Sequence, residues 1–300
     1  MTLLHERELA LVLALALGGC GGSEFSAGDS AGAGGAAGNA SGGAAGSATG
    51  GAAGTASGGS AGNPSGGAAG SSGGAAGAAG GGGNCPDDMV AFQGQFCIDK
   101  HEVTIGQYDG WLNNDPSLQD QPAECSWNAD YDRGNSLACL GTANQPVRCV
   151  DWCDAYAYCK GQGKRLCGRR GTGASNDYAD YKDPQRSEWY AACSNEAQNT
   201  FPYGDTYGPN TCNGKDHLLP PGPVGVGTMS GCVGGVIGLF DMSGNVAEWE
   251  DSCNAQNGSG DDCRVRGGSY NADESILRCD NGLSSPRNNK PPVIGIRCCK

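Results

Sequence analysis

Sixteen of the seventeen cysteines lie between Cys85 and Cys299, and this density constrains the fold more than any other feature. An even, dense set in a segment of this size indicates disulfide bonds formed in an oxidising compartment. Zinc binding is the alternative, but paired C-x2-C modules are missing and the chain has only three histidines. We therefore expect up to eight disulfide bonds, whose pairing the sequence leaves open.

The first 20 residues resemble a bacterial lipoprotein signal peptide. Arg7 precedes an apolar run at residues 9–17 that is too short to span a bilayer. The run ends in L-G-G-C, which resembles a lipobox and predicts a lipid anchor on Cys20. A plain secretory signal, cleaved elsewhere, is the alternative. With the anchor, the protein would be extracytoplasmic in the bacterial cell envelope, at the outer membrane or cell surface.

Residues 21–84 consist mainly of Gly, Ala and Ser and should form a disordered linker that spaces the rest from a membrane. Residues 85–300 are long enough for one domain with a sizeable core. One basic and four acidic residues of the chain's 19 and 32 lie before residue 85, so the domain keeps 18 and 28, a net charge of −10. This charge argues against nucleic acid as a partner.

Short periodic segments predict a loop-rich, disulfide-dense α+β fold with little regular structure. Alternation over residues 89–98 predicts a hairpin that turns near Gln93 and Gly94, with its ends joined by Cys85 and Cys97. Three helices are expected: one capped by Thr104, one that follows a short strand at 146–152 and ends near Gly161, and one capped by Ser187. Residues 113–145 should form a long loop held by a bridge at Cys125 and Cys139.

The segment 238–251 concentrates hard oxygen ligands. Asp241, Asn245 and Glu248 lie within eight residues, and Gly244 allows a sharp bend that presents carbonyl oxygens. Such a cluster suits calcium. A buried turn whose polar groups cap one another is the equal alternative, and the spacing is not that of an EF-hand loop.

Eight landmarks in order resemble the formylglycine-generating enzyme family, also called the sulfatase-modifying factor domain. They are residues 96–104 (F-C-I-D-K-H-E-V-T), 145–152 (Q-P-V-R-C-V-D-W), 163–167 (G-K-R-L-C), 187–192 (S-E-W-Y-A-A), 201–204 (F-P-Y-G), 238–249 (G-L-F-D-M-S-G-N-V-A-E-W), 266–270 (R-G-G-S-Y) and 295–298 (G-I-R-C). The resemblance implies the C-type-lectin-like α+β fold of that family.

The resemblance also shows that the family's copper-binding cysteine pair is missing from this chain. The formylglycine-generating enzymes bind copper with two cysteines after the G-G-S motif, and these positions fall at Ala272 and near Leu277, within residues 274–277. Cu(I) needs soft thiolate ligands, so copper-type activity is not expected. The iron-dependent relatives use a histidine-rich site from an additional N-terminal domain. Only His101 and His217 fall in the domain here, so iron is not expected either.

Calcium is expected instead. Carried over by position, the family's calcium ligands would be Asp241, the carbonyl groups of Gly244 and Val246, and Glu248. Asn213 and Gly214 resemble the start of a second calcium site, whose downstream acidic partner cannot be matched.

A pocket is expected beside this turn. Ala247 stands where the family often has Trp, which should reshape the cleft. The candidate pocket residues are Ser269, Tyr270, Arg278 and Arg297. The alternative for both arginines is a buried hydrogen-bonding role in the core.

Two functions follow from these features. The first is a membrane-anchored binding or structural module, stabilised by calcium and disulfides, with a protein or carbohydrate ligand in its cleft. The alternative is an oxidoreductase of the formylglycine-generating or non-haem-iron kind with an altered active site. It would use another metal or a redox-active bridge between Cys298 and Cys299.

Overall fold

The computed structural model describes residues 85–218 and 220–300. The predicted signal peptide, the lipid anchor on Cys20 and the linker at 21–84 lie outside these residues. Within the described part of the chain, no helix is long and apolar enough to cross a membrane.

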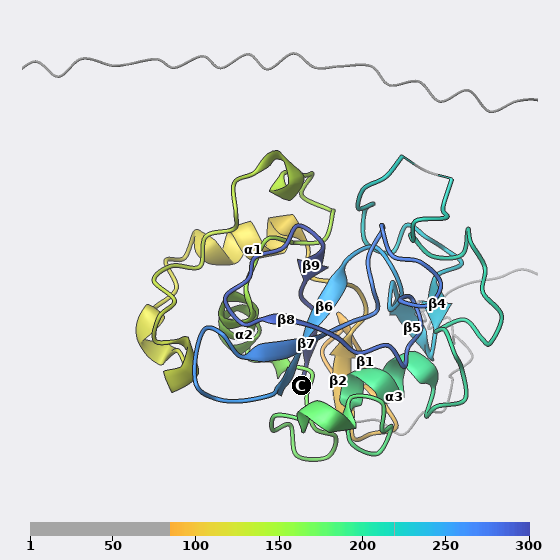
Figure 1. Ribbon diagram of the computed structural model, residues 1–300, viewed down its shortest axis with the longest axis horizontal. Helices are drawn as coiled ribbons and strands as arrows, with labels where there is room; N and C mark the ends of the chain where they lie inside the picture. The colour runs from red at the N-terminus through yellow and green to blue at the C-terminus, as the bar shows by residue number, and fades with distance from the viewer. Residues whose placement is uncertain (1–84, 219) are drawn as a thin grey trace, which may run out of the picture. The chain divides into compact units, whose positions relative to one another are not determined.

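Short helices and strands joined by long loops make up the domain, which confirms the predicted loop-rich α+β class (Figure 1). The α-helices are α1 (Ile105–Leu112), α2 (Trp152–Gly161) and α3 (Glu188–Ser194), and the 3₁₀ helices are η1 (Leu118–Asp120), η2 (Ala123–Cys125), η3 (Leu137–Cys139) and η4 (Tyr178–Asp180). The strands are β1 (Met89–Phe92), β2 (Phe96–Asp99), β3 (Arg165–Leu166), β4 (Val233–Gly234), β5 (Val236–Phe240), β6 (Ala247–Cys253), β7 (Asp262–Arg266), β8 (Leu283–Pro286), β9 (Ile294–Gly295) and β10 (Cys298–Cys299).

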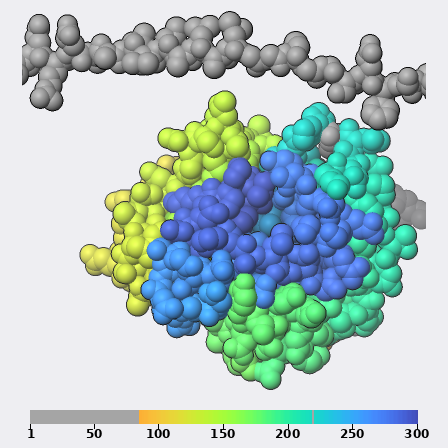
Figure 2. All heavy atoms as spheres, viewed as in Figure 1, coloured from red at the N-terminus to blue at the C-terminus, as the bar shows by residue number. Residues whose placement is uncertain are grey.

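The strands form two four-stranded sheets and one two-stranded ribbon. One sheet has the order β1-β2-β10-β3, the other β8-β7-β6-β9, and β4 pairs with β5. In Figure 1, α1 and α2 lie on one side of strands β6–β9, whereas α3 and the β4–β5 ribbon lie on the other. Figure 2 shows a face whose middle is formed by C-terminal segments, in blue, with green residues around α3 along one edge. Segments from both halves of the domain therefore meet around the strand β6.

Local sequence signals explain most of these elements. Gln93 (φ 49°) and Gly94 (φ 70°) make the predicted hairpin turn. Thr104 caps α1 by accepting from the backbone N–H of Gln107, whose side chain in turn accepts from Thr104 N. Ser187 caps α3 as predicted.

The predicted strand before α2 is wrong. Within residues 146–152, only Pro146 takes part in a bridge, with Thr104, and Trp152 already begins α2. Cys149 has a left-handed backbone (φ 61°), which is incompatible with a continuous strand. Its N–H donates to Pro291 O instead of to a neighbouring strand.

All sixteen cysteines of the described residues form eight disulfide bonds. Cys85–Cys97 joins the hairpin ends as predicted. The long loop is held by two bridges, because Cys125 pairs with Cys153 and Cys139 with Cys149. The remaining bonds are Cys159–Cys298, Cys167–Cys299, Cys193–Cys279, Cys212–Cys232 and Cys253–Cys263.

The short strand β10 separates two apolar cores. Cys298 belongs to the larger core, around α1 and α2, and Cys299 to the smaller core, around α3. Successive side chains of a strand point to opposite faces, so the two cysteines are directed apart. The alternative of a redox-active Cys298–Cys299 bridge is therefore wrong, since both sulfurs bond to distant cysteines.

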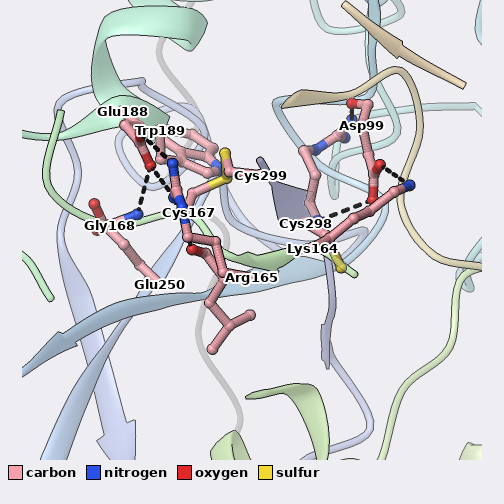
Figure 3. The surroundings of a disulfide bond; sticks show 12 residues. Asp99, Lys164, Arg165, Cys167, Gly168, Glu188, Trp189, Glu250, Cys298 and Cys299 are labelled. Atoms are coloured by element: carbon pink, nitrogen blue, oxygen red, sulfur yellow. Dashed lines mark hydrogen bonds and ion pairs between the residues drawn. A yellow bond between two sulfur atoms is a disulfide. The ribbon is translucent and has the colours of Figure 1, made fainter. Parts of the chain in front are cut away.

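Charged side chains fix the surroundings of this strand (Figure 3). The Asp99 carboxylate accepts from Lys164 Nζ at 2.6 Å and from the Cys298 N–H at 3.0 Å. On the other side, Arg165 makes a two-point ion pair with the buried Glu188, with distances of 2.5 and 2.7 Å. Buried ion pairs of this kind hold β2, β3, α3 and β10 in one arrangement.

Candidate functional site

The predicted calcium turn connects β5 to β6 and has an unusual backbone. Asp241 (φ 56°) and Asn245 (φ 58°) both adopt the left-handed conformation, as does Gly244 (φ 77°). A Cβ atom on Gly244 would lie 2.4 Å from the carbonyl oxygen of Asn213, so only glycine fits there. The turn is therefore packed tightly against the segment that contains Asn213.

Asn245 organises the interior of the turn. Its side-chain N–H group donates to Glu102 Oε2 at 2.6 Å, and the Val246 N–H donates to Glu102 Oε1 at 3.0 Å. Its side-chain oxygen accepts from the Val224 N–H at 2.9 Å and from the Asn213 amide at 3.2 Å. The side-chain amide of Asn245 thus connects the turn to three other segments of the chain, those of Glu102, Asn213 and Val224.

Glu248 is paired within the core. Its Oε1 accepts from Arg297 Nε at 2.8 Å, and its Oε2 accepts from the indole N–H of Trp189 at 2.6 Å. Arg297 also donates to the carbonyl oxygens of Asp99 and Phe240, each at 2.8 Å. Arg297 is fully buried and hence belongs to the core rather than to the predicted pocket.

The turn holds more negative than positive charge. Glu102, Asp241 and Glu248 are all buried, and Arg297 is the cation that interacts with all three. Burial raises the pKa of Glu102 well above its usual value, and the carboxylates of Asp241 and Glu248 raise it further. Burial likewise raises the pKa of Asp241 to about 6, against the lowering effects of the Gly227 N–H and Arg297.

The donor atoms of the turn suit a hard cation. Within the described residues, no hydrogen-bond donor reaches the carbonyl oxygens of Gly244 and Val246 or Oδ1 of Asp241. These oxygen atoms, with the surplus of negative charge, fit the ligand preference of calcium. Among the described residues, no three His, Cys, Asp or Glu side chains are placed to hold a metal ion together, so any ion here would depend on carbonyl groups.

Asn213 and Gly214, the start of the predicted second calcium site, lie against the turn between β5 and β6 rather than apart from it. The Asn213 carbonyl oxygen accepts from the Asn245 N–H at 2.8 Å, and its side chain also donates to Gly222 O at 3.0 Å. The Gly214 carbonyl oxygen accepts from the His217 N–H. Through these hydrogen bonds, Asn213 supports the turn between β5 and β6.

The positions of the family's copper cysteines lie together in an apolar cluster. Ala272 and Leu277 are both buried with Phe201, and Ile276 packs against them. A Cβ on Gly214 would lie 2.5 Å from the Leu277 side chain, so the cluster also packs against the segment beside the turn. The expected thiolate positions therefore meet in space, as the resemblance implies, but carry aliphatic groups.

The other predicted pocket residues surround this cluster. Ser269 is buried and contacts Asn271, and the Tyr270 N–H donates to Asn245 O at 3.0 Å. Arg278 pairs with Asp280 at 2.8 Å and is partly exposed. It lines an open hollow with five further residues, mostly charged: Lys215, Asp216, Asp273, Glu274 and Ser275.

Sequence reasoning missed Glu102 as part of the site. It was noted only as a letter of the E-V-T landmark, yet its carboxylate holds the turn from 143 residues away in sequence. An acidic residue between His101 and Val103, directly before the cap Thr104, is a signal that could have been followed.

The family model of the sulfatase-modifying factor enzyme 1-like domain matches residues 60–300. The formylglycine-generating enzyme of Mus musculus is 27% identical over 198 residues, which are 56% of this chain and 47% of the mouse protein. The formylglycine-generating enzyme of Bos taurus is 24% identical over 277 residues, 72% of this chain and 68% of the bovine protein. The chain thus spans less than half of the mouse relative.

Solved structures show a lower level of similarity. PvdO from Pseudomonas aeruginosa is 18% identical with a TM-score of 0.48, over 68% of this chain and 79% of that chain. Treponema denticola variable protein 1 is 16% identical with a TM-score of 0.44, over 68% of this chain and 84% of that chain.

Proposed function

Because the chain belongs to the sulfatase-modifying factor enzyme 1-like domain family, we propose that it keeps the family's fold but works as a binding or structural module. It would act outside the cytoplasm, tethered to a membrane through Cys20. A ligand, protein or carbohydrate, would bind in the cleft beside the turn. Its dense disulfide framework supports an oxidising location.

The single observation that carries this proposal is the apolar cluster at Ala272 and Leu277. Copper-dependent oxidation needs thiolates, and the two expected positions carry a methyl and an isobutyl group. Every cysteine between residues 85 and 300 is already in a disulfide bond, so none of them is a thiolate that could replace the missing pair.

Calcium would serve as a structural ion in this module. Asp241 and the carbonyl groups of Gly244 and Val246 would hold it, with Glu248 contributing if it releases a donor. A bound divalent cation would offset the negative charge of the turn. The chain's own residues do the rest: Asn245 holds the turn to Glu102, and Arg297 holds Glu248 to the core.

A copper test addresses the proposal directly. The purified chain is incubated with copper and a cysteine-containing sulfatase peptide, and peptide mass and Cu(I) binding are measured. We expect neither oxidation of the peptide nor tight Cu(I) binding by the parent protein. The matched variant Ala272→Cys/Leu277→Cys should gain Cu(I) binding, because the two positions lie in one cluster.

Turnover of the peptide by the parent protein would refute the proposal. Failure of the double variant to bind Cu(I) would instead refute the assignment of the two positions, because the introduced thiols would then be too far apart.

A further inference from the structure

One indole group in the domain differs from the other four. Trp127 donates to Glu124 O, Trp152 to Glu250 O, Trp189 to the Glu248 carboxylate and Trp249 to Val150 O, at distances of 2.6–3.1 Å. The indole N–H of Trp111 has no acceptor within the described residues. The Trp111 side chain is only 8% exposed, and its N–H is open to the cavity beside it, where it can donate to a ligand.

Trp111 lines a cavity of about 340 Å³ between the C-terminal end of α2 and the loop after α1. Most of its wall is apolar or aromatic and comes from Trp111, Pro116, Tyr131, Ala157 and Gly161. A methyl group on Gly161 would lie 2.6 Å from the indole nitrogen, so the absence of a side chain there keeps the N–H accessible. This volume is at the lower end of the range for small-molecule sites, about 300–1,000 Å³.

Three polar side chains complete the lining: Ser117, Asp120 and Lys160. Lys160 Nζ donates to the Asp120 backbone carbonyl at 2.8 Å, which fixes the ammonium group at the cavity. The Asp120 carboxylate has neither a hydrogen bond nor an ion pair within the described residues. The cavity therefore offers donors from Trp111 and Lys160, an acceptor from Asp120, and no net charge.

We propose that this cavity binds a single neutral sugar ring. A hexopyranose has an apolar C–H surface that suits the walls of Pro116, Tyr131 and Ala157. Its hydroxyl groups both accept and donate, which matches the Trp111 N–H and the Asp120 carboxylate. The balance of Lys160 and Asp120 favours a ligand without net charge over an anionic or cationic one.

This site is separate from the turn at 238–251. None of its lining residues belongs to the turn or to the apolar cluster around Ala272. Sugar binding therefore neither requires nor excludes the function proposed above, and each proposal can fail without the other.

The indole N–H itself provides the readout. Nuclear magnetic resonance of the isotopically labelled chain gives one side-chain signal for each of the five indoles, and the signal missing from Trp111→Phe identifies residue 111. Methyl glycosides of glucose, galactose and N-acetylglucosamine are titrated to about 50 mM, which would nearly saturate a site with a dissociation constant of about 1 mM. We expect the Trp111 signal to shift while the other four stay in place.

Variants test the individual contacts. Trp111→Phe should weaken binding about fivefold, the value of one hydrogen bond. Asp120→Asn, at an exposed position that does not endanger folding, should weaken it by a similar factor. Trp127→Phe is the matched control and should leave binding unchanged, because its indole donates to the protein.

No shift of the Trp111 signal with any glycoside would overturn the proposal. A shift produced by an amino acid or a dipeptide, but not by the glycosides, would overturn the assignment to sugars. Binding that survives both Trp111→Phe and Asp120→Asn unchanged would place the ligand elsewhere and would also refute it.

Discussion

Removing the Cys159–Cys298 bond should destabilise the domain about as much as removing the Cys139–Cys149 bond, although its partners lie much farther apart in sequence. The two bonds are matched in burial, since all four cysteines are nearly inaccessible. The partners are 139 residues apart in the first bond and 10 in the second, but the neighbouring Cys167–Cys299 bond already joins the two distant segments of the first. A comparison of Cys159→Ala/Cys298→Ala with Cys139→Ala/Cys149→Ala therefore tests whether a neighbouring bond shortens the loop that a disulfide closes.

The expected magnitude follows from chain entropy. With Cys167–Cys299 intact, the Cys159–Cys298 bond closes a loop of only about 9 residues, through residues 159–167 and 298–299, so each bond should stabilise the folded state by about 2.6 kcal/mol and the two losses should agree within about 1 kcal/mol. Both double variants leave no new free thiol, and seven bonds remain in each.

Denaturant unfolding without reductant measures the free energy of unfolding of both variants and the parent. A loss from Cys159→Ala/Cys298→Ala that exceeds the other by about 2 kcal/mol would refute this reasoning, because the bond would then act as the closure of the whole 139-residue loop.

Two further predictions concern the charged groups. The parent protein should melt at a lower temperature in chelator than in calcium, and the difference should correspond to about 2.7 kcal/mol when free calcium is 100 times the dissociation constant. Asp241→Asn should remove this shift, whereas the exposed control Asp273→Asn should keep it. An absent shift in the parent would count against calcium. Burial and the Asp151 carboxylate raise the pKa of Asp154 to about 7, against the lowering effect of Lys290. The folded state therefore holds a proton that the unfolded chain releases near pH 4. The free energy of unfolding should therefore fall as pH rises from about 4 to about 7, and Asp154→Asn should flatten that part of the curve; a parent curve that rises over this interval would contradict the assignment.

Local elements could be predicted because their signals are short-range. The Gln93-Gly94 turn and the caps at Thr104 and Ser187 depend on residues only a few positions apart, and all three are confirmed. The strand expected before α2 failed for the opposite reason. Residues 146–152 are held by tertiary contacts instead, in which Cys149 has a left-handed backbone and its N–H donates to Pro291 O.

Long-range features were harder to predict. The pairing of Cys298 and Cys299 with Cys159 and Cys167 joins residues more than 130 positions apart, and no local rule chooses it over a vicinal bridge. Order along the chain did place Ala272 and Leu277 in one neighbourhood. The contact between Glu102 and Asn245 required the folded chain, because hydrogen-bond partners far apart in sequence carry no periodic signal.

The central position of β10 has a consequence for biogenesis. Its neighbours in the sheet, β2 and β3, are complete by residue 166, but the strand that pairs with both begins only at residue 298. While residues 298–299 are still inside the ribosome or an export channel, the sheet stays open at its centre, and Cys159 and Cys167 lack their partners. Any bonds that these two thiols form earlier must be reshuffled afterwards, so we expect maturation in the cell to depend on a disulfide isomerase.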